Sequence, residues 1–197
     1  MKIKIICIVV VILIAIPMVS TAVEVESIVS GSFVYEGQEY IVSEKFNAEN
    51  NSIEEQDIDG DGKKETISGF QGLSNDDVRI PVAFLVISKD ETVQTISGNS
   101  YFTKFELIDI DNDGYSEIVF WSAGGAHYTQ VDIYKYSKGQ IKSIFSRGSA
   151  CGIDLKKDDG VYMIRVGQPI WDDPEWNYSK EPLWETWKWT EDRFSRV

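Results

Sequence analysis

The sequence predicts a mainly β protein that folds as a single compact domain of antiparallel meanders. Three observations predict this class. Apolar and polar residues alternate over short runs, as they do in half-buried strands, and long helical periodicity is absent. Two similar units open at Asp57 and at Asp109, so the chain contains a repeat. The length of 197 residues, with 43% hydrophobic and 12% aromatic residues, is enough to form a packed core.

The composition excludes several classes of site. The formal net charge is −13, and so acidic a surface repels phosphate groups, so we expect neither nucleic-acid binding nor attachment to anionic membrane surfaces. Two cysteines, Cys7 and Cys151, are too few for a disulfide framework or a cysteine-based zinc site. The single histidine, His127, excludes a site of clustered histidines. The balance of charge points instead to a hard cation as ligand.

Residues 1–22 have the pattern of a secretory signal peptide. A short basic start precedes the uncharged apolar run Ile5–Val19, and Ala22 closes a site of small residues. We expect cleavage there and a β-domain over residues 23–197. The alternative is an uncleaved N-terminal membrane anchor, because no charge follows before Glu24. Both readings place the domain outside the cytoplasm, secreted or at the cell surface, with the anchor as its only contact with a membrane.

The elements after the leader begin with a hairpin. Residues 32–35 and 39–42 alternate in polarity and flank a turn at 36–38. We expect this hairpin to cover one edge of the sheet that follows. Residues 46–56 are polar and predict a loop or one short helical turn.

Two units of the same organisation follow, near residues 57–98 and 109–147. Each opens with an acidic loop and continues through strand, connection, strand, tight turn and strand. A degenerate third unit covers residues 153–197. There, residues 154–160 replace the acidic loop, and lysines in the middle predict a plain turn without metal. Within these two units, strands are expected at residues 84–88 and 92–96, and at residues 131–136 and 140–144.

A four-stranded meander of this kind is the blade of a β-propeller. Three units are too few to close a propeller, because about four blades is the usual minimum. We therefore expect meanders that resemble incomplete propeller blades and stack into one compact antiparallel domain.

The acidic loops have the pattern of a calcium site. Carboxylates at the first, third and fifth positions of a tight loop converge on one point, where like charges repel one another unless a cation lies between them. Ca²⁺ takes such oxygens together with a backbone carbonyl from the seventh position, and glycine at the sixth permits the sharp turn. Mg²⁺ suits the loop less, because it demands a strict octahedron and keeps its waters.

The alternative is that Asp and Gly form ordinary solvated turns here. Two loops with the same pattern and the same following strand favour metal binding in at least one of them. Lys63 and Tyr115 would contribute only their carbonyls. The expected ligands are Asp57, Asp59, Asp61, Lys63 and Glu65 in the first loop, and Asp109, Asp111, Asp113, Tyr115 and Glu117 in the second.

The loops are not EF-hands. An EF-hand needs a bidentate Glu at the twelfth position and a helix on each side. Ser68 and Phe120 stand at that position, and strand-forming residues follow the ninth position in both loops. The last carboxylate ligand is therefore expected at the ninth position, from Glu65 and Glu117, and each loop is expected between strands.

At these residues the chain resembles the FG-GAP and VCBS repeats, which are known from integrin α-chain propellers and many secreted bacterial proteins. Asp109–Val119 follows their pattern, Asp-x-Asp-x-Asp-Gly-x-x-(Asp/Glu) directly before a strand, and the turn Gly124–His127 before an aromatic strand is also similar. The resemblance covers residues 57–147, with the tail as a weak third copy. It implies Ca²⁺ held mainly for structure, and a role in adhesion or surface recognition. The chain departs from the family in its Glu at the ninth position and in its low repeat count.

Other conspicuous residues carry less information. His127 follows a glycine-rich turn and has no nucleophile motif beside it, so we interpret it as a turn residue. Trp187 and Trp189 share one strand face and predict core. Trp171 and Trp176 lie in a proline-containing loop beside carboxylates, where exposed rings would bind a carbohydrate or a protein partner.

The sequence as a whole predicts an extracytoplasmic calcium-binding β-repeat protein, a non-catalytic module for binding, adhesion or surface recognition. Its partner would be an extracellular protein or a carbohydrate. The alternative is a cell-envelope carbohydrate-active enzyme or an enzyme inhibitor, and a third reading is a purely structural surface protein. Nothing singles out a catalytic pair of carboxylates, so we assign no enzymatic activity.

Overall fold

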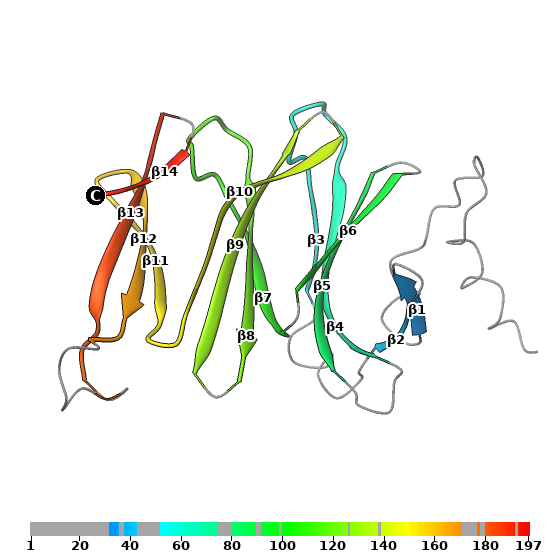
Figure 1. Ribbon diagram of the computed structural model, residues 1–197. Helices are drawn as coiled ribbons and strands as arrows, with labels where there is room; N and C mark the ends of the chain where they lie inside the picture. The colour runs from blue at the N-terminus through cyan, green and yellow to red at the C-terminus, as the bar shows by residue number, and fades with distance from the viewer. Residues whose placement is uncertain are drawn as a thin grey trace, which may run out of the picture. The chain divides into compact units, whose positions relative to one another are not determined.

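The computed structural model describes the greater part of the chain after the leader. The described residues are 32–35, 38–42, 52–74, 80–89, 92–98, 100–125, 127–137, 139–170, 177, 180–191 and 193–197. The predicted leader over residues 1–22, with Cys7, lies outside them, as do Trp171 and Trp176. None of the described residues is helical, so this part of the chain also offers no helix able to cross a bilayer. The predicted class, a mainly β chain of antiparallel sheets, is confirmed (Figure 1).

The chain divides into two compact units, of which the first comprises Met1–Gln56 and Lys64–Phe102. Its sheet has the order β1-β2-β4-β5-β6, and β3 pairs with β4 on the same edge as β2 but along the other half of that strand. The strands are β1 (Ser32–Tyr35), β2 (Gln38–Val42), β3 (Ser52–Gln56), β4 (Glu65–Ser74), β5 (Pro81–Lys89) and β6 (Thr92–Gly98).

The core of this unit is aromatic. Phe84 on β5 is fully buried, and its ring lies 5.0 Å from that of Tyr40, 5.5 Å from that of Phe70 and 5.7 Å from that of Tyr35. Residues 82–87 of β5 are buried without interruption, as expected for a central strand covered on both faces. The predicted hairpin at residues 32–42 is present and extends the sheet through β2.

The second unit comprises Asp57–Lys63 and Thr103–Val197 and holds two four-stranded meanders. The first has the order β10-β9-β8-β7 and the second β11-β12-β13-β14. The strands are β7 (Tyr101–Ile108, of which the first two residues belong to the first unit), β8 (Glu117–Gly124), β9 (Tyr128–Ser137), β10 (Gln140–Ser149), β11 (Ile153–Asp158), β12 (Val161–Gln168), β13 (Leu183–Thr190) and β14 (Arg193–Arg196).

These two sheets share one core. Val131 and Ile133 from β9 meet Ile164 and Val166 from β12, and all four are fully buried. Burying such side chains stabilises a fold by roughly 1.5–3 kcal/mol each. The two half-buried tryptophans of β13 that were predicted as core pack against this cluster, as do the rings of Phe145 and Phe194, whose centroids lie 4.8 Å apart.

The first two meanders begin one strand earlier than the repeat units expected from the sequence. The third begins at Ile153, as expected, but residues 154–158, which were expected to form part of a plain turn, belong to strand β11. The acidic loops connect β3 to β4 and β7 to β8, so a strand precedes each loop. The polar stretch expected as loop or helical turn contains β3, an edge strand whose Glu54 and Glu55 are exposed. Charged side chains are common on edge strands because they discourage pairing with other chains. In the third meander β11 and β12 are joined by a plain two-residue turn at Asp159 and Gly160, both with positive φ.

Candidate metal centre

The two acidic loops are hairpin tips with the same backbone conformation. At the fourth position, Gly60 has φ 77° and Asn112 has φ 59°; at the sixth, Gly62 has φ 86° and Gly114 has φ 94°. Left-handed residues at both positions curl the chain around its own aspartates, and Gly and Asn adopt this conformation most easily. The loop therefore needs a residue that tolerates positive φ at the fourth position as well as at the sixth. The sequence analysis predicted only the sixth.

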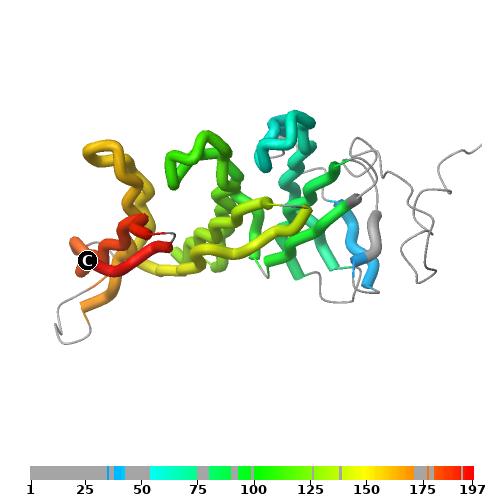
Figure 2. The backbone as a smooth tube through the Cα atoms, turned by 90° about the horizontal axis from the view of Figure 1, so that it is seen from above, coloured from blue at the N-terminus to red at the C-terminus, as the bar shows by residue number. Residues whose placement is uncertain are grey.

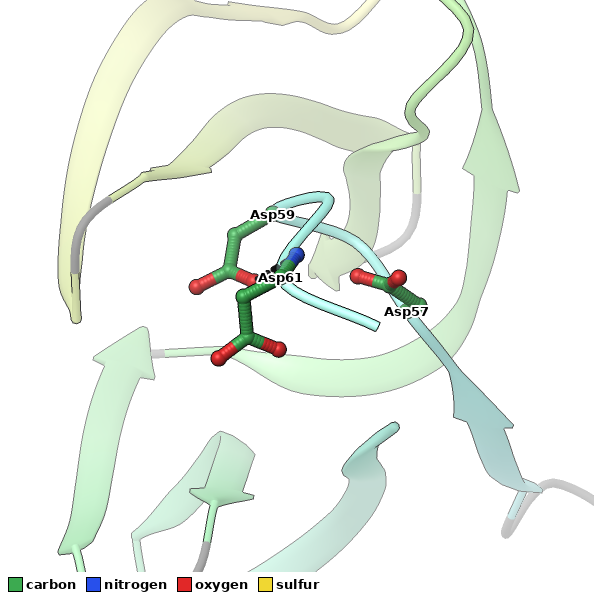
Figure 3. A group of neighbouring side chains, drawn as sticks. All are labelled: Asp57, Asp59 and Asp61. Carbon is green, nitrogen blue, oxygen red and sulfur yellow. Dashed lines mark hydrogen bonds between the residues drawn. The ribbon is translucent and has the colours of Figure 1, made fainter. Parts of the chain in front are cut away.

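The first tip brings Asp57, Asp59 and Asp61 together. Each offers a carboxylate oxygen that lies within 4.8 Å of the other two. Figure 3 shows Asp59 and Asp61 side by side, with Asp57 pointing toward them from the end of β3. Asp57 accepts hydrogen bonds from the backbone N–H groups of Gly60 at 2.7 Å and Gly62 at 2.9 Å.

The other two aspartates of this tip are also oriented by the backbone. Asp59 accepts a hydrogen bond from the N–H of Asp61 at 3.3 Å, and Asp61 accepts one from the N–H of Lys63 at 2.9 Å. These backbone hydrogen bonds fix the orientation of the carboxylates. The tip is therefore folded with its acceptors preoriented toward a common point.

The second tip also brings three carboxylates together, but they come from a different set of positions in the loop. Asp109, Asp111 and Glu117 offer oxygens that lie within 4.8 Å of one another. Asp109 accepts from the N–H of Gly114 at 3.1 Å, and Glu117, the first residue of β8, accepts from the N–H of Ile110 at 2.9 Å. The fifth-position Asp113 is not in this group of mutually close oxygens.

A lysine from a neighbouring strand lies against the second tip. The Lys135 ammonium on β9 donates to Asp111, to Asp113 at 2.7 Å, and lies 3.2 Å from Glu117 Oε1. The register that pairs Ile118 with Tyr134 places Lys135 opposite Glu117. The sequence reading missed this residue, since cross-strand register is not visible in a linear pattern.

The charges of this cluster shift one another's pKa values. Burial lowers the pKa of Lys135, but its hydrogen bonds to the carboxylates outweigh burial and hold that pKa above its usual value. Burial likewise tends to raise the pKa of Asp113, yet hydrogen bonds from Lys135 and from the N–H of Tyr115 hold it below its usual value. Burial raises the pKa of Glu117 even though Lys135 lies beside it.

The acceptors of the second tip are not exhausted by the protein. Asp109 Oδ1 is buried and accepts no hydrogen bond from the described part of the chain. A buried oxygen without a donor is costly, and it indicates room for a further positive group. The carboxylates of Asp109, Asp111, Asp113 and Glu117 also outnumber the single ammonium of Lys135.

The ninth-position glutamates occupy equivalent places but have different neighbours. Glu65 is the first residue of β4 and is fully buried, and its Oε1 lies 2.6 Å from the ammonium of Lys89. Glu65 is not part of the group formed by the three aspartates of its loop, whereas Glu117 belongs to the group in the second loop. A buried carboxylate facing a cross-strand lysine thus recurs in both sheets.

The side chains of the remaining predicted residues are not members of the two acidic groups. Lys63 and Tyr115 are exposed, and a role for their carbonyls stays a prediction. His127 is exposed in the turn between β8 and β9. The possible ligand role of Trp171 and Trp176 stays a prediction, because both lie outside the described residues.

The hairpin tips of the second unit lie next to one another (Figure 2). A Cβ atom added to Gly60 would lie 2.6 Å from Cε1 and 2.7 Å from Oη of Tyr115, so the tyrosine of the second tip packs directly on the first. On the other side of the second tip, the Lys157 ammonium lies 3.4 Å from Oδ1 of Asn112. The acidic tips therefore form a row with the plain turn between β11 and β12.

The two acidic groups have the chemistry of hard-cation sites and could hold a metal ion. Ca²⁺ binds oxygens at about 2.3–2.6 Å, so its ligands on opposite sides are about 4.6–5.2 Å apart. Oxygens within 4.8 Å of one another are compatible with that spacing. No protein-family model matches the chain, and no curated protein or solved structure is significantly similar to it.

Proposed function

We propose that the protein is an extracytoplasmic calcium-binding β-repeat protein, a non-catalytic module for binding, adhesion or surface recognition. Its acidic hairpin tips would bind Ca²⁺ in the manner of FG-GAP and VCBS repeats. The proposal depends above all on one observation. The same acidic hairpin tip occurs twice, with convergent carboxylates at Asp57, Asp59 and Asp61 and again at Asp109, Asp111 and Glu117.

The residues present fit the ion by charge, ligand type and spacing. Carboxylate oxygens are the ligands that Ca²⁺ prefers, and it tolerates irregular shells of six to eight oxygens better than Mg²⁺ does. The buried Asp109 Oδ1 without a donor supplies an acceptor in the second tip. A bound ion would neutralise repelling aspartates and fix the two tips, which already touch through Gly60 and Tyr115.

The extracytoplasmic part of the proposal rests on the sequence. The pattern of residues 1–22 favours export. Extracellular modules bind Ca²⁺ with dissociation constants of about 10⁻⁴ to 10⁻³ M, which suits the millimolar calcium found outside cells. Sites of this affinity would be filled after export and would stabilise the folded protein there.

Thermal unfolding of the purified protein with Ca²⁺ and with a chelator tests the proposal. Ligand at roughly 100 times its dissociation constant stabilises the folded state by about 2.7 kcal/mol per site. For a chain of this size each kcal/mol corresponds to roughly 2–4 °C. We expect Ca²⁺ to raise the melting temperature by at least about 5 °C, and Mg²⁺ at the same concentration to raise it less.

A pair of matched variants identifies the site. Asp57→Asn combined with Asp109→Asn keeps the side-chain shape but removes a charged ligand from each tip, and is expected to abolish the calcium shift. Asp158→Asn combined with Asp159→Asn changes the same charge in the plain turn between β11 and β12, and is expected to retain it. An equal calcium shift in both double variants, or none in the wild type, would refute the proposal.

A further inference from the structure

The first sheet ends in an open edge at β6. This strand pairs with β5 from Thr92 to Gly98, and the strand order of the described sheet ends with it. Residues 93–98 are all exposed or half-buried, whereas residues 82–87 of β5 are buried without interruption. One row of backbone N–H and C=O groups along β6 therefore faces away from the sheet, as it does on any edge strand.

β6 lacks the features that usually protect an edge strand. Its sequence, Thr-Val-Gln-Thr-Ile-Ser-Gly, has no charged residue and no proline, in a chain with 32 acidic and 19 basic residues. The edge strands β3, β7, β10, β11 and β14 all carry charged side chains. β1 is uncharged as well, but it is only four residues long. An uncharged edge of seven residues is a ready template for pairing with another strand.

The sequence of β6 suits pairing with a second copy of itself. Two copies related by a two-fold axis place this strand antiparallel to itself, and an axis at Thr95, the middle of Thr92–Gly98, pairs the whole strand. Thr95 then lies opposite the partner's Thr95, and Val93 lies opposite the partner's Ser97. Such a register brings no like charges together. Pairs of threonines stabilise neighbouring antiparallel strands through their side chains.

We propose that the protein forms a two-fold symmetric dimer in which the β6 strands of two copies pair antiparallel and join their sheets. A second copy supplies an uncharged strand of the same length, so the pairing buries no unpaired charge. It also satisfies the N–H and C=O groups that the two open edges expose. The dimer requires no calcium, so this inference and the proposed function can fail independently of each other.

The charge of the protein selects this edge, and the size of the contact makes the dimer weak. A net charge of −13 makes two copies repel each other, so an uncharged edge is the most favourable place for them to meet. Interfaces below about 1,200 Å² are weak or transient, and a single pair of seven-residue strands belongs to that class. We therefore expect a dissociation constant on the order of 10⁻⁴ M.

Sedimentation velocity at several protein concentrations tests the proposal. With a dissociation constant of about 10⁻⁴ M, less than about a tenth of the chains should be dimeric at about 5 µM and more than half at about 500 µM. Salt at about 0.5 M should strengthen dimerisation, because it screens the repulsion between the acidic copies. A monomer at every concentration, or assembly that continues beyond a dimer, would overturn the proposal.

A lysine on the two-fold axis locates the interface. Thr95→Lys places two positive charges directly opposite each other in the dimer, which is destabilising, and we expect dimerisation to weaken at least about tenfold. Thr103→Lys adds the same charge at an exposed position of the edge strand β7 and is expected not to weaken the dimer. The melting temperatures of both variants show that they fold. Equal dimerisation by the two variants would show that β6 is not the interface.

Cysteine cross-linking tests the register and does not depend on the lysine variant. Residues that face each other across antiparallel strands have Cα atoms about 4.5–5.5 Å apart, a distance that a disulfide spans. In a Cys7→Ser, Cys151→Ser background, Thr95→Cys should form a disulfide-linked dimer under mild oxidation. Ser97→Cys should not, because four residues of strand, or roughly 13 Å, separate its two copies. Equal cross-linking of both variants, or of neither, would contradict the proposed pairing.

Discussion

Lys135 is the residue that most affects how the second acidic tip works. Its ammonium contacts Asp111 and Glu117, the carboxylates that would also bind a metal ion. An ion entering this tip must displace the ammonium or share its carboxylates. The lysine neutralises part of the acidic charge of this tip, and it would compete with a metal ion that binds there. The second tip should be the weaker calcium site for this reason.

Replacing Lys135 by Met should strengthen calcium binding at the second tip. The substitution keeps the chain length but removes the competing charge, so we expect affinity to rise about tenfold, or about 1.4 kcal/mol. The protein should be less stable without calcium, because the carboxylates lose their cation. Calorimetric titration in an Asp57→Asn background reports the second tip alone.

The exposed Lys142→Met on β10 is the control for lost net charge and should bind calcium as the parent does. An unchanged or lower affinity in Lys135→Met would show that the lysine does not compete for these carboxylates.

At the scale of the elements, the acidic tips are packed units, and not only ligand-bearing turns. Gly60 lies under the ring of Tyr115, and any side chain at this position would collide with it. Gly62 has the same left-handed backbone, but a Cβ there would meet nothing within 4 Å. Substitutions at Gly60 and Gly62 therefore distinguish two costs. Both impose the cost of a left-handed backbone on a residue with a side chain, and only the one at Gly60 also disturbs the packing of one tip on the other.

Gly60→Ala should therefore destabilise the protein more than Gly62→Ala. Alanine in a left-handed conformation costs about 1–2 kcal/mol at either position. At Gly60 the methyl group also displaces the ring of Tyr115, which should add about 0.5 kcal/mol, since that ring is 41% exposed and its far end can move aside. Urea unfolding of both variants measures the difference. Equal losses of stability would show that the tips do not pack as described, and Tyr115→Ala in the Gly60→Ala background should restore the lost increment.

The strands and loops with strong local signals were predictable, and the others were not. The strands expected at residues 84–88 and 131–136 lie inside β5 and β9, because both are runs of β-branched and aromatic residues. The first meander strand, β3, was missed because its sequence, Ser-Ile-Glu-Glu-Gln, has no apolar alternation and gains its pairing from β4. The local sequence pattern does not reveal an edge strand whose conformation depends on pairing with a neighbouring strand.

Part of the candidate site was likewise predictable from the local sequence, and part was not. The aspartates at the first, third and fifth positions and the glycine at the sixth are local features, and their spacing was sufficient to predict the acidic tips. The pairing of Lys89 with Glu65 and the contact of Lys135 with the second tip were not predictable, because both depend on antiparallel register.

At the scale of the whole molecule, the net charge is the property that most affects the stability of the fold. The net charge of −13 opposes the compact state, and part of it is concentrated in the two acidic groups. Bound calcium would relieve the repulsion where it is strongest.

The number of calcium ions bound per chain, measured by calorimetric titration, is the most direct test of the two calcium sites. We predict two ions for the wild type, one for Asp57→Asn, one for Asp109→Asn and none for the double variant, with dissociation constants of about 10⁻⁴ to 10⁻³ M. Absence of binding to the wild type, or a stoichiometry that the double variant leaves unchanged, would contradict the assignment of both hairpin tips as calcium sites.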